Sequence, residues 1–237
     1  MSWSNVWAGF LARLQNTFGA WEVPAEPWMW WAVIATVALL VATPAWAYIR
    51  QIVTVVHELG HAIVGVLCGR RFIGFVINRD MSGHTVTIGK SRGPGITLTT
   101  LAGYPMPALA GAAMVVAAMS GWAALVLLTG IVLLLAALIR ARSGYTLVAL
   151  TVLLIGSISL WWRENGLFSA LIVLGVGMLL IIGAWRQLAA VIFRGGRGDD
   201  PAMLASLTSL PRSLWHLVLL ILVTLPTWWA VNAILVR

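Results

Sequence analysis

Charged residues are scarce in this chain: they make up 9% of its 237 residues, against 61% for hydrophobic residues. A soluble domain usually carries about 25% charged residues, so this chain cannot cover a water-facing surface of ordinary composition. The mean hydropathy of +0.95 agrees with this. The deficit excludes an ordinary soluble protein and indicates an integral membrane protein.

Cysteine is nearly absent as well. Cys68 is the single cysteine, which excludes a disulfide within the chain. The net charge of +8 comes from lysines and arginines in short clusters between apolar runs, and these form no basic face or nucleic-acid motif. We therefore expect the clusters to mark membrane topology and to contact lipid headgroups, with the lipid bilayer and no nucleic acid as partner.

Tryptophan, by contrast, is abundant, with 14 in the chain. In residues 1–27 the tryptophans and other apolar residues are spread amphipathically, unlike the compact apolar core of a cleaved signal peptide. We expect this segment to lie on the membrane surface with its tryptophans at headgroup level. Residues 28–237 are expected to form a single integral membrane domain.

The fold class predicted from the apolar runs is an all-α polytopic membrane protein with about seven transmembrane helices, each of roughly 20 apolar residues. The expected spans are 28–49, 51–69, 96–120, 122–139, 145–162, 167–185 and 214–236. Pro44 and Pro226 fall inside expected spans, where neighbouring helices can compensate a kink. The stretch "AGYPMPALAG", residues 102–111, predicts a broken or bent segment that lines a cavity or packs on protein.

A short β-hairpin is expected at the membrane surface between the second and third spans, in residues 70–93. "FIGFVI" and "HTVTIG" are β-rich runs, and "NRDMSG" between them is a cluster of turn formers. An ordinary polar loop is the alternative.

The orientation follows from the lysines and arginines, which favour the cytoplasmic side. Seven spans with the amino terminus inside place 12 of the 15 basic residues in the cytoplasm, including Arg13 and those around the hairpin. Arg50, Arg163 and Arg237 are left outside. The prediction is a multi-pass cell-membrane protein whose hairpin faces the cytosol.

The stretch "TVVHELGHAIVG", residues 54–65, places three ionisable groups inside an apolar run. Residues i and i+4 share a helix face, so His57 and His61 can offer a ring nitrogen to one metal ion, with Glu58 beside them. This is the H-E-x-x-H pattern of zinc peptidases, in which the glutamate is the general base. A charged group at mid-bilayer costs about 2.5–3.5 kcal/mol, which favours a functional role over a polar contact between helices.

Two other functions are compatible with these residues. A catalytically inactive, protease-like membrane scaffold would share the fold. A metal or solute transporter would use His57, Glu58 and His61 as an ion pathway, although transporters often carry repeated halves with paired broken helices, and no repeat is visible here.

The HELGHA segment, the hairpin and the "AGY" segment together resemble the site-2 protease class of intramembrane metalloproteases, and more closely its M50B-like branch, from about residue 53 to residue 211. The resemblance implies a helical bundle that holds Zn²⁺ within the bilayer on the cytosolic side and cleaves peptide bonds in or near transmembrane segments of protein substrates. It further implies that His57 and His61 ligate zinc, that Glu58 is the general base and that a distant aspartate is the third ligand.

A catalytic zinc needs three protein ligands, and the residues alone leave several candidates for the third: Asp80, His84, Glu164, Asp199, Asp200 and His216. Pro201 at a first helical position predicts Asp200 as the N-cap of a helix that ends near Pro211. The resemblance assigns the ligand to Asp200 rather than Asp199, through an aspartate followed by an apolar "LA…LT…LP" helix. The chain departs from the site-2 pattern in lacking N-x-x-P-x-P-x-x-D-G and a PDZ-like domain.

Overall fold

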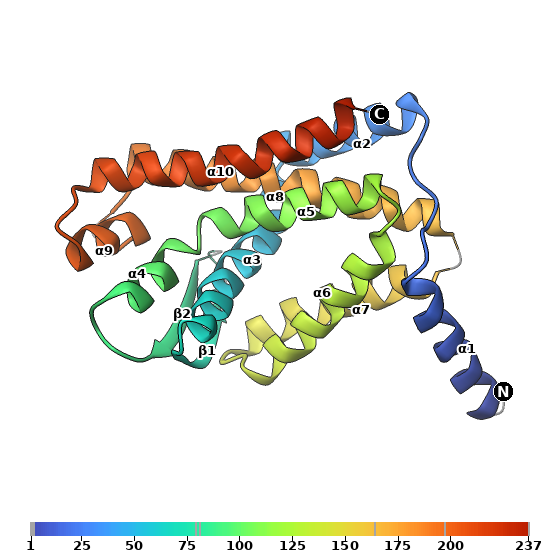
Figure 1. Cartoon of the computed structure of the whole chain (residues 1–237), viewed down its shortest axis with the longest axis horizontal. Coiled ribbons are helices and arrows are strands. Elements are labelled where there is room, and N and C mark those ends of the chain that lie inside the picture. Colours follow the sequence, from blue (N-terminus) through green and yellow to red (C-terminus); the bar gives the residue numbers. More distant parts are fainter. Residues whose placement is uncertain (1–2, 79, 81, 164, 197, 237) are drawn as a thin grey trace.

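The computed structural model describes residues 3–78, 80, 82–163, 165–196 and 198–236, in which ten helices and two strands are present (Figure 1). In chain order they are α1 (Trp3–Thr17), α2 (Pro27–Ala42), α3 (Trp46–Leu67), β1 (Arg71–Ile77), β2 (Gly83–Ile88), α4 (Pro94–Leu101), α5 (Pro105–Met119), α6 (Ala123–Ile139), α7 (Gly144–Trp162), α8 (Gly166–Arg194), α9 (Asp200–Leu207) and α10 (Arg212–Leu235).

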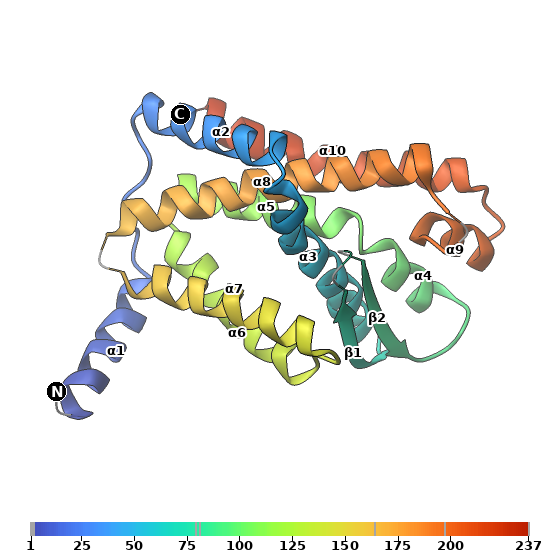
Figure 2. The same cartoon turned by 180° about the vertical axis from the view of Figure 1, so that it is seen from behind.

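Helices α2, α5, α8 and α10 lie roughly along the longest axis of the molecule, with α5, α8 and α10 forming its centre, whereas α3 runs obliquely to them (Figures 1 and 2). The hairpin, α4 and α9 lie at one end of this axis, and both chain ends lie toward the other. The candidate residues named from the sequence belong to α3, the hairpin, the start of α9 or α10. Glu164 lies outside the described residues.

Within the residues that the structure describes, three helices are long and apolar enough to cross a membrane: α7, α8 and α10. The number rises to five if each of two bent helix pairs counts as one span, and α6 is a shorter apolar helix. A mostly helical membrane protein is therefore confirmed, but seven separate spans are not.

The first bent pair corrects the expected boundary between spans 28–49 and 51–69. α2 ends at Ala42 and α3 begins at Trp46, with a bend of 102° between them. Pro44 therefore lies between two helices instead of inside one. The cause is local, because a residue before proline avoids the helical region, and Thr43 is extended with φ −100° and ψ 167°. Pro226, as expected, lies inside α10.

The second bent pair, α4 and α5, meets at an angle of 59°. The predicted break in "AGYPMPALAG" is thereby confirmed, and it falls on Ala102, Gly103 and Tyr104. Helix α5 then packs closely along α8, where a Cβ on Gly111 would lie 2.5 Å from the carbonyl oxygen of Gly177. Small residues let helix backbones approach in this way in membranes, so α5 and α8 hold the break in a fixed place.

The predicted hairpin is present as the antiparallel pair of β1 and β2, from Arg71 opposite Ile88 to Ile77 opposite Gly83. It packs against α3, where Gly65 leaves room for Thr87 of β2. The outer edge of β1 is bonded at Phe75 to residues Arg140 and Arg142. Within the described residues the sheet has only these two strands, so β2 is left with an unpaired edge.

The expected sides of two arginines need correction. Arg13 of α1 donates hydrogen bonds to the backbone carbonyls of Trp161 and Arg163, so Arg13 and Arg163 lie at the same end of the molecule. Arg50 donates a 3.0 Å hydrogen bond to the carbonyl of Asp80 and lies beside the hairpin. The expectation treated α2 and α3 as two separate crossings, whereas the structure has them as a bent pair with Arg13 at the end opposite the hairpin.

Candidate metal centre

Two histidines of α3 and one aspartate of α9 bring their side chains to one point. The Nε2 atoms of His57 and His61 are 3.2 Å apart. The Oδ2 atom of Asp200 is 3.3 Å from each of them. This is the one group of three such ligands found among the described residues, and it contains the three residues that the sequence and the resemblance had named.

The spacing of these three atoms fits a zinc ion. Zinc bonds of about 2.0–2.2 Å in a tetrahedral arrangement separate neighbouring ligand atoms by about 3.3–3.6 Å, close to the observed 3.2 and 3.3 Å. The Oδ2 atom of Asp200 is also buried without a hydrogen-bond partner among the described residues. Two imidazoles and one carboxylate are a ligand set of catalytic zinc sites.

The outer nitrogen of His61 is fixed by a second contact. Its Nδ1 atom lies 2.7 Å from the backbone carbonyl of Thr99, at the end of α4. Because a carbonyl only accepts, Nδ1 donates this hydrogen bond, and Nε2 is the ring atom directed at Asp200 and His57. Such an outer partner fixes the tautomer of metal-binding histidines.

The two aspartates of "GDDP" have different contacts. Asp199, not Asp200, is the N-cap of α9: its Oδ1 accepts a 3.0 Å hydrogen bond from the backbone N–H of Ala202, and its Oδ2 is paired with Arg212. The prediction of Asp200 as the cap is therefore wrong. Pro201 occupies the second helical position, which moves the cap one residue earlier and leaves the Asp200 carboxylate available to the histidines.

The charge of Asp200 suits a ligand. Burial raises the pKa of its carboxyl group, but the facing rings of His57 and His61 lower it by more, so the pKa lies well below its usual value. The carboxylate is therefore ionised at neutral pH, which is the form that binds a metal ion.

Glu58 lies next to the histidines and is held by the hairpin. Its side chain is buried, with 4% of the residue exposed. Thr85 of β2 places its hydroxyl 2.6 Å from Oε2 of Glu58. Gly83 packs on the same carboxylate, since a Cβ there would lie 2.3 Å from Oε1. The hairpin thus sets the direction of the carboxylate.

The break between α4 and α5 places Gly103 directly against the histidines. A Cβ on Gly103 would lie 2.5 Å from Nε2 of His61 and 2.6 Å from Nε2 of His57. The next residue, Tyr104, packs edge-on against the His57 ring with 4.9 Å between ring centroids. The sequence predicted that the "AGY" break lines a cavity or packs on protein. It did not predict that Gly103 lies against the Nε2 atoms of the two histidines.

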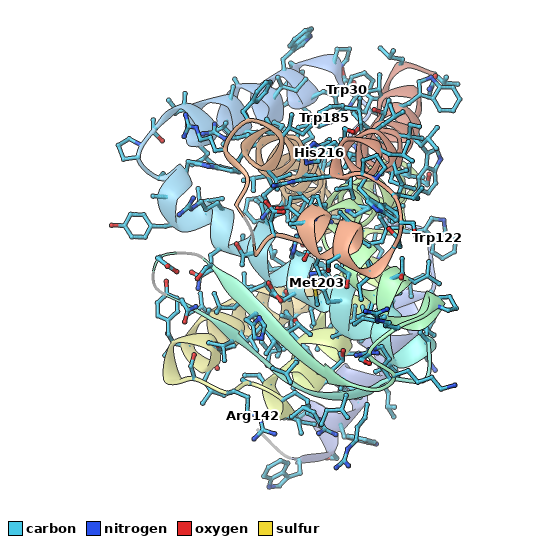
Figure 3. The ribbon with its side chains drawn as sticks, turned by 90° about the vertical axis from the view of Figure 1, so that its left-hand side faces the viewer. Trp30, Trp122, Arg142, Trp185, Met203 and His216 are labelled. Atoms are coloured by element: carbon cyan, nitrogen blue, oxygen red, sulfur yellow. The ribbon has the colours of Figure 1, made fainter. Side chains whose placement is uncertain are left out.

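A cavity of about 920 Å³ opens onto His57 and Glu58. Its lining comes from α3, the end of α8, the start of β2 at Gly83, Tyr104 and the segment before α9. The volume is of the size that ligand-binding clefts have. Figure 3 looks at this end of the molecule: Met203 of α9 appears between His216 of α10 and the hairpin.

The remaining candidates for the third ligand have other contacts. The Oδ1 atom of Asp80 accepts hydrogen bonds from the backbone and hydroxyl of Ser82, and His84 points outward from β2 and is exposed. His216 is in α10 and does not join the group of three ligands. Glu164 lies outside the described residues.

The fold and the site together define a helical membrane protein with a His–His–Asp cluster beside a buried glutamate. The model of the Peptidase M50B-like family matches residues 30–231. The chain belongs to this family, and its likeness to the M50B branch is confirmed. Comparisons with curated proteins and with solved structures gave no match.

Proposed function

We propose that the protein is an intramembrane zinc metalloprotease of the site-2 protease kind, which hydrolyses peptide bonds in or near transmembrane segments of membrane-protein substrates. His57, His61 and Asp200 are the proposed zinc ligands, and Glu58 is the proposed general base. The observation that carries the proposal is the nearly equilateral triangle of ligand atoms, 3.2–3.3 Å on each side, next to a buried glutamate in a chain of a peptidase family.

In the proposed hydrolysis, the metal ion and the side chains have different roles. A zinc ion bound by the three ligands would supply Lewis acidity that polarises the scissile carbonyl and acidifies water. Glu58 takes a proton from the attacking water and passes it to the amine that leaves. Thr85 and Gly83 keep the Glu58 carboxylate in one orientation, and Thr99 keeps His61 in the tautomer that binds metal.

Two features near this centre suit a peptide substrate. The cavity of about 920 Å³ can take an unwound stretch of peptide. The unpaired edge of β2 can hold the same stretch as an added strand, since Thr85 on that strand reaches Glu58. An extended peptide exposes its carbonyl groups, which a hydrogen-bonded helix does not.

We infer that the centre faces the cytosolic side of a cell membrane and that α1 lies in the opposite membrane interface. Basic residues flank the hairpin and the α6–α7 connection, among them Arg70, Lys90 and Arg142, as expected for a cytoplasmic end. At the other end α1 exposes Trp3 and Trp7, whose rings suit the headgroup layer.

The test uses the full-length protein in liposomes and a panel of fluorescently labelled single-span transmembrane peptides. We expect wild type to release peptide fragments, a chelator to stop this and zinc to restore it, and Glu58→Gln to bind zinc but release no fragments. A Glu58→Gln variant that cleaves like wild type would overturn the proposal. Metal transport into the liposomes without cleavage would favour a transporter, and full cellular function of Glu58→Gln would favour a scaffold.

A further inference from the structure

The second aspartate of the pair, Asp199, uses both of its carboxylate oxygens in structural contacts. Oδ1 caps α9 through the backbone N–H of Ala202, and Oδ2 is paired with the guanidinium of Arg212. The side chains of Asp199 and Arg212 are 14% and 32% exposed. Removing one partner of a partly buried ion pair leaves the other charge without compensation, which is costly.

Arg212 is the first residue of α10, so the pair joins the start of α9 to the start of the next helix. The other end of α9 is tied to α10 as well, since Nε1 of Trp215 donates a 3.1 Å hydrogen bond to the hydroxyl of Thr208. In between, Leu204 is fully buried. Both ends of α9 therefore contact α10, and Asp200 directly follows Asp199, which makes the contact at the first end.

Gly195 leaves the space that the pair occupies. A Cβ on Gly195 would lie 2.1 Å from Nη2 of Arg212 and 2.6 Å from Oδ2 of Asp199. The backbone of Gly195, at φ −58° and ψ 146°, is one that any residue adopts. The same Cβ would lie 2.2 Å from the carbonyl oxygen of Val191, so the missing side chain leaves room both for the pair and for the end of α8.

We propose that Arg212 is a positioning residue for the metal centre: by holding Asp199, it sets the start of α9 so that the Asp200 carboxylate meets His57 and His61. The inference rests on the proposed zinc centre. Asp199 thus fixes the backbone at the start of α9, and Asp200 faces the proposed metal site. A ligand placed on a short helix after a glycine-rich segment depends on such support for its geometry.

The test measures metal binding, not activity. Zinc affinity is determined by competition with a chelator, and the absorption spectrum of bound Co²⁺ reports ligand geometry, both on the full-length protein in detergent. We expect Arg212→Gln and Asp199→Asn to weaken zinc binding about 10–100-fold, as loss of an outer partner does, and to alter the Co²⁺ spectrum. Arg212→Lys keeps the charge but not the planar fork, so we expect part of the affinity to return.

Two matched controls separate positioning from general damage. Arg194 lines the same cavity and has no ion pair in the part of the chain that the structure describes, so Arg194→Gln should bind zinc like wild type. Gly196→Ala, whose Cβ would meet no atom within 4 Å, is the second control and should also bind zinc like wild type.

The outcomes are distinguishable from those of the proposed function. If wild type binds zinc and both Arg212→Gln and Asp199→Asn keep its affinity and its Co²⁺ spectrum, the positioning role is wrong and the metal centre stands. If wild type itself binds no metal, the metal centre fails and the positioning role fails with it. Should Arg212→Gln not fold, Asp199→Asn and Arg212→Lys, compared with Arg194→Gln, decide between these outcomes.

Discussion

The hydroxyl of Thr85 lies 2.6 Å from Oε2 of Glu58 and 3.1 Å from the backbone carbonyl of the same residue. A hydroxyl has one proton to donate, and the shorter, charge-assisted contact to the carboxylate takes it. The strand that is open to an added peptide is therefore the strand that orients the proposed general base. Binding of substrate and orientation of the base are coupled through one residue.

Replacing Thr85 with valine keeps the shape of the side chain and removes the hydrogen bond. We expect kcat to fall about 10–100-fold while zinc content stays at the wild-type level, because an outer partner of the site is lost but no metal ligand. Thr85→Ser, which keeps the hydroxyl, should retain most of the activity. Equal kcat values for wild type and Thr85→Val would show that the hydrogen bond does not matter.

Replacing Gly103 with alanine places a methyl group 2.5–2.6 Å from the Nε2 atoms of His57 and His61. We expect most of the bound zinc to be lost, because the methyl group takes the space next to the ligand atoms and pushes the rings apart. Zinc per chain, measured after gel filtration, checks this.

Gly156→Ala is the control for that variant. Gly156 lies in α7 and a Cβ there meets no atom within 4 Å, so zinc content should not change and the helix should gain a little stability. Wild-type zinc content in Gly103→Ala would mean that the break between α4 and α5 does not border the bound metal.

The placing of α1 at the end opposite the hairpin can be tested by labelling. In a Cys68→Ser background, Asn16→Cys and Ser91→Cys each introduce one exposed thiol. We expect a membrane-impermeant maleimide to label Asn16→Cys from outside intact cells and Ser91→Cys only after the membrane is opened, since basic residues around Ser91 favour the cytoplasm. Labelling of both from the same side would contradict the arrangement of α2 and α3 as one bent crossing.

Local patterns predicted the histidine pair, the hairpin and the break at "AGY" well, because each depends on residues close together in the chain. The spacing of His57 and His61 is a property of any helix. The turn formers between two β-rich runs likewise determine a hairpin without help from the rest of the fold.

The errors have long-range or positional causes. Pro44 explains locally where the chain bends between α2 and α3, but how the two helices then pack does not follow from Pro44 alone. The cap of α9 was misplaced by one residue because Asp199 and Asp200 both precede Pro201 and are equally good caps; the partner that selects Asp199 is Arg212, beyond the end of α9. Gly83, Gly103 and Thr85 were missed because a residue's closeness to the site across the fold leaves no local pattern.

The most direct test is the zinc content of the purified full-length protein, compared among wild type, His61→Ala, Asp200→Ala and Glu58→Gln. We expect about one zinc ion per chain in wild type and Glu58→Gln, and almost none in His61→Ala and Asp200→Ala, since three protein ligands are needed to hold a catalytic zinc. Folded wild-type protein that takes up no zinc, or Asp200→Ala protein that binds zinc as wild type does, would contradict the His57–His61–Asp200 centre.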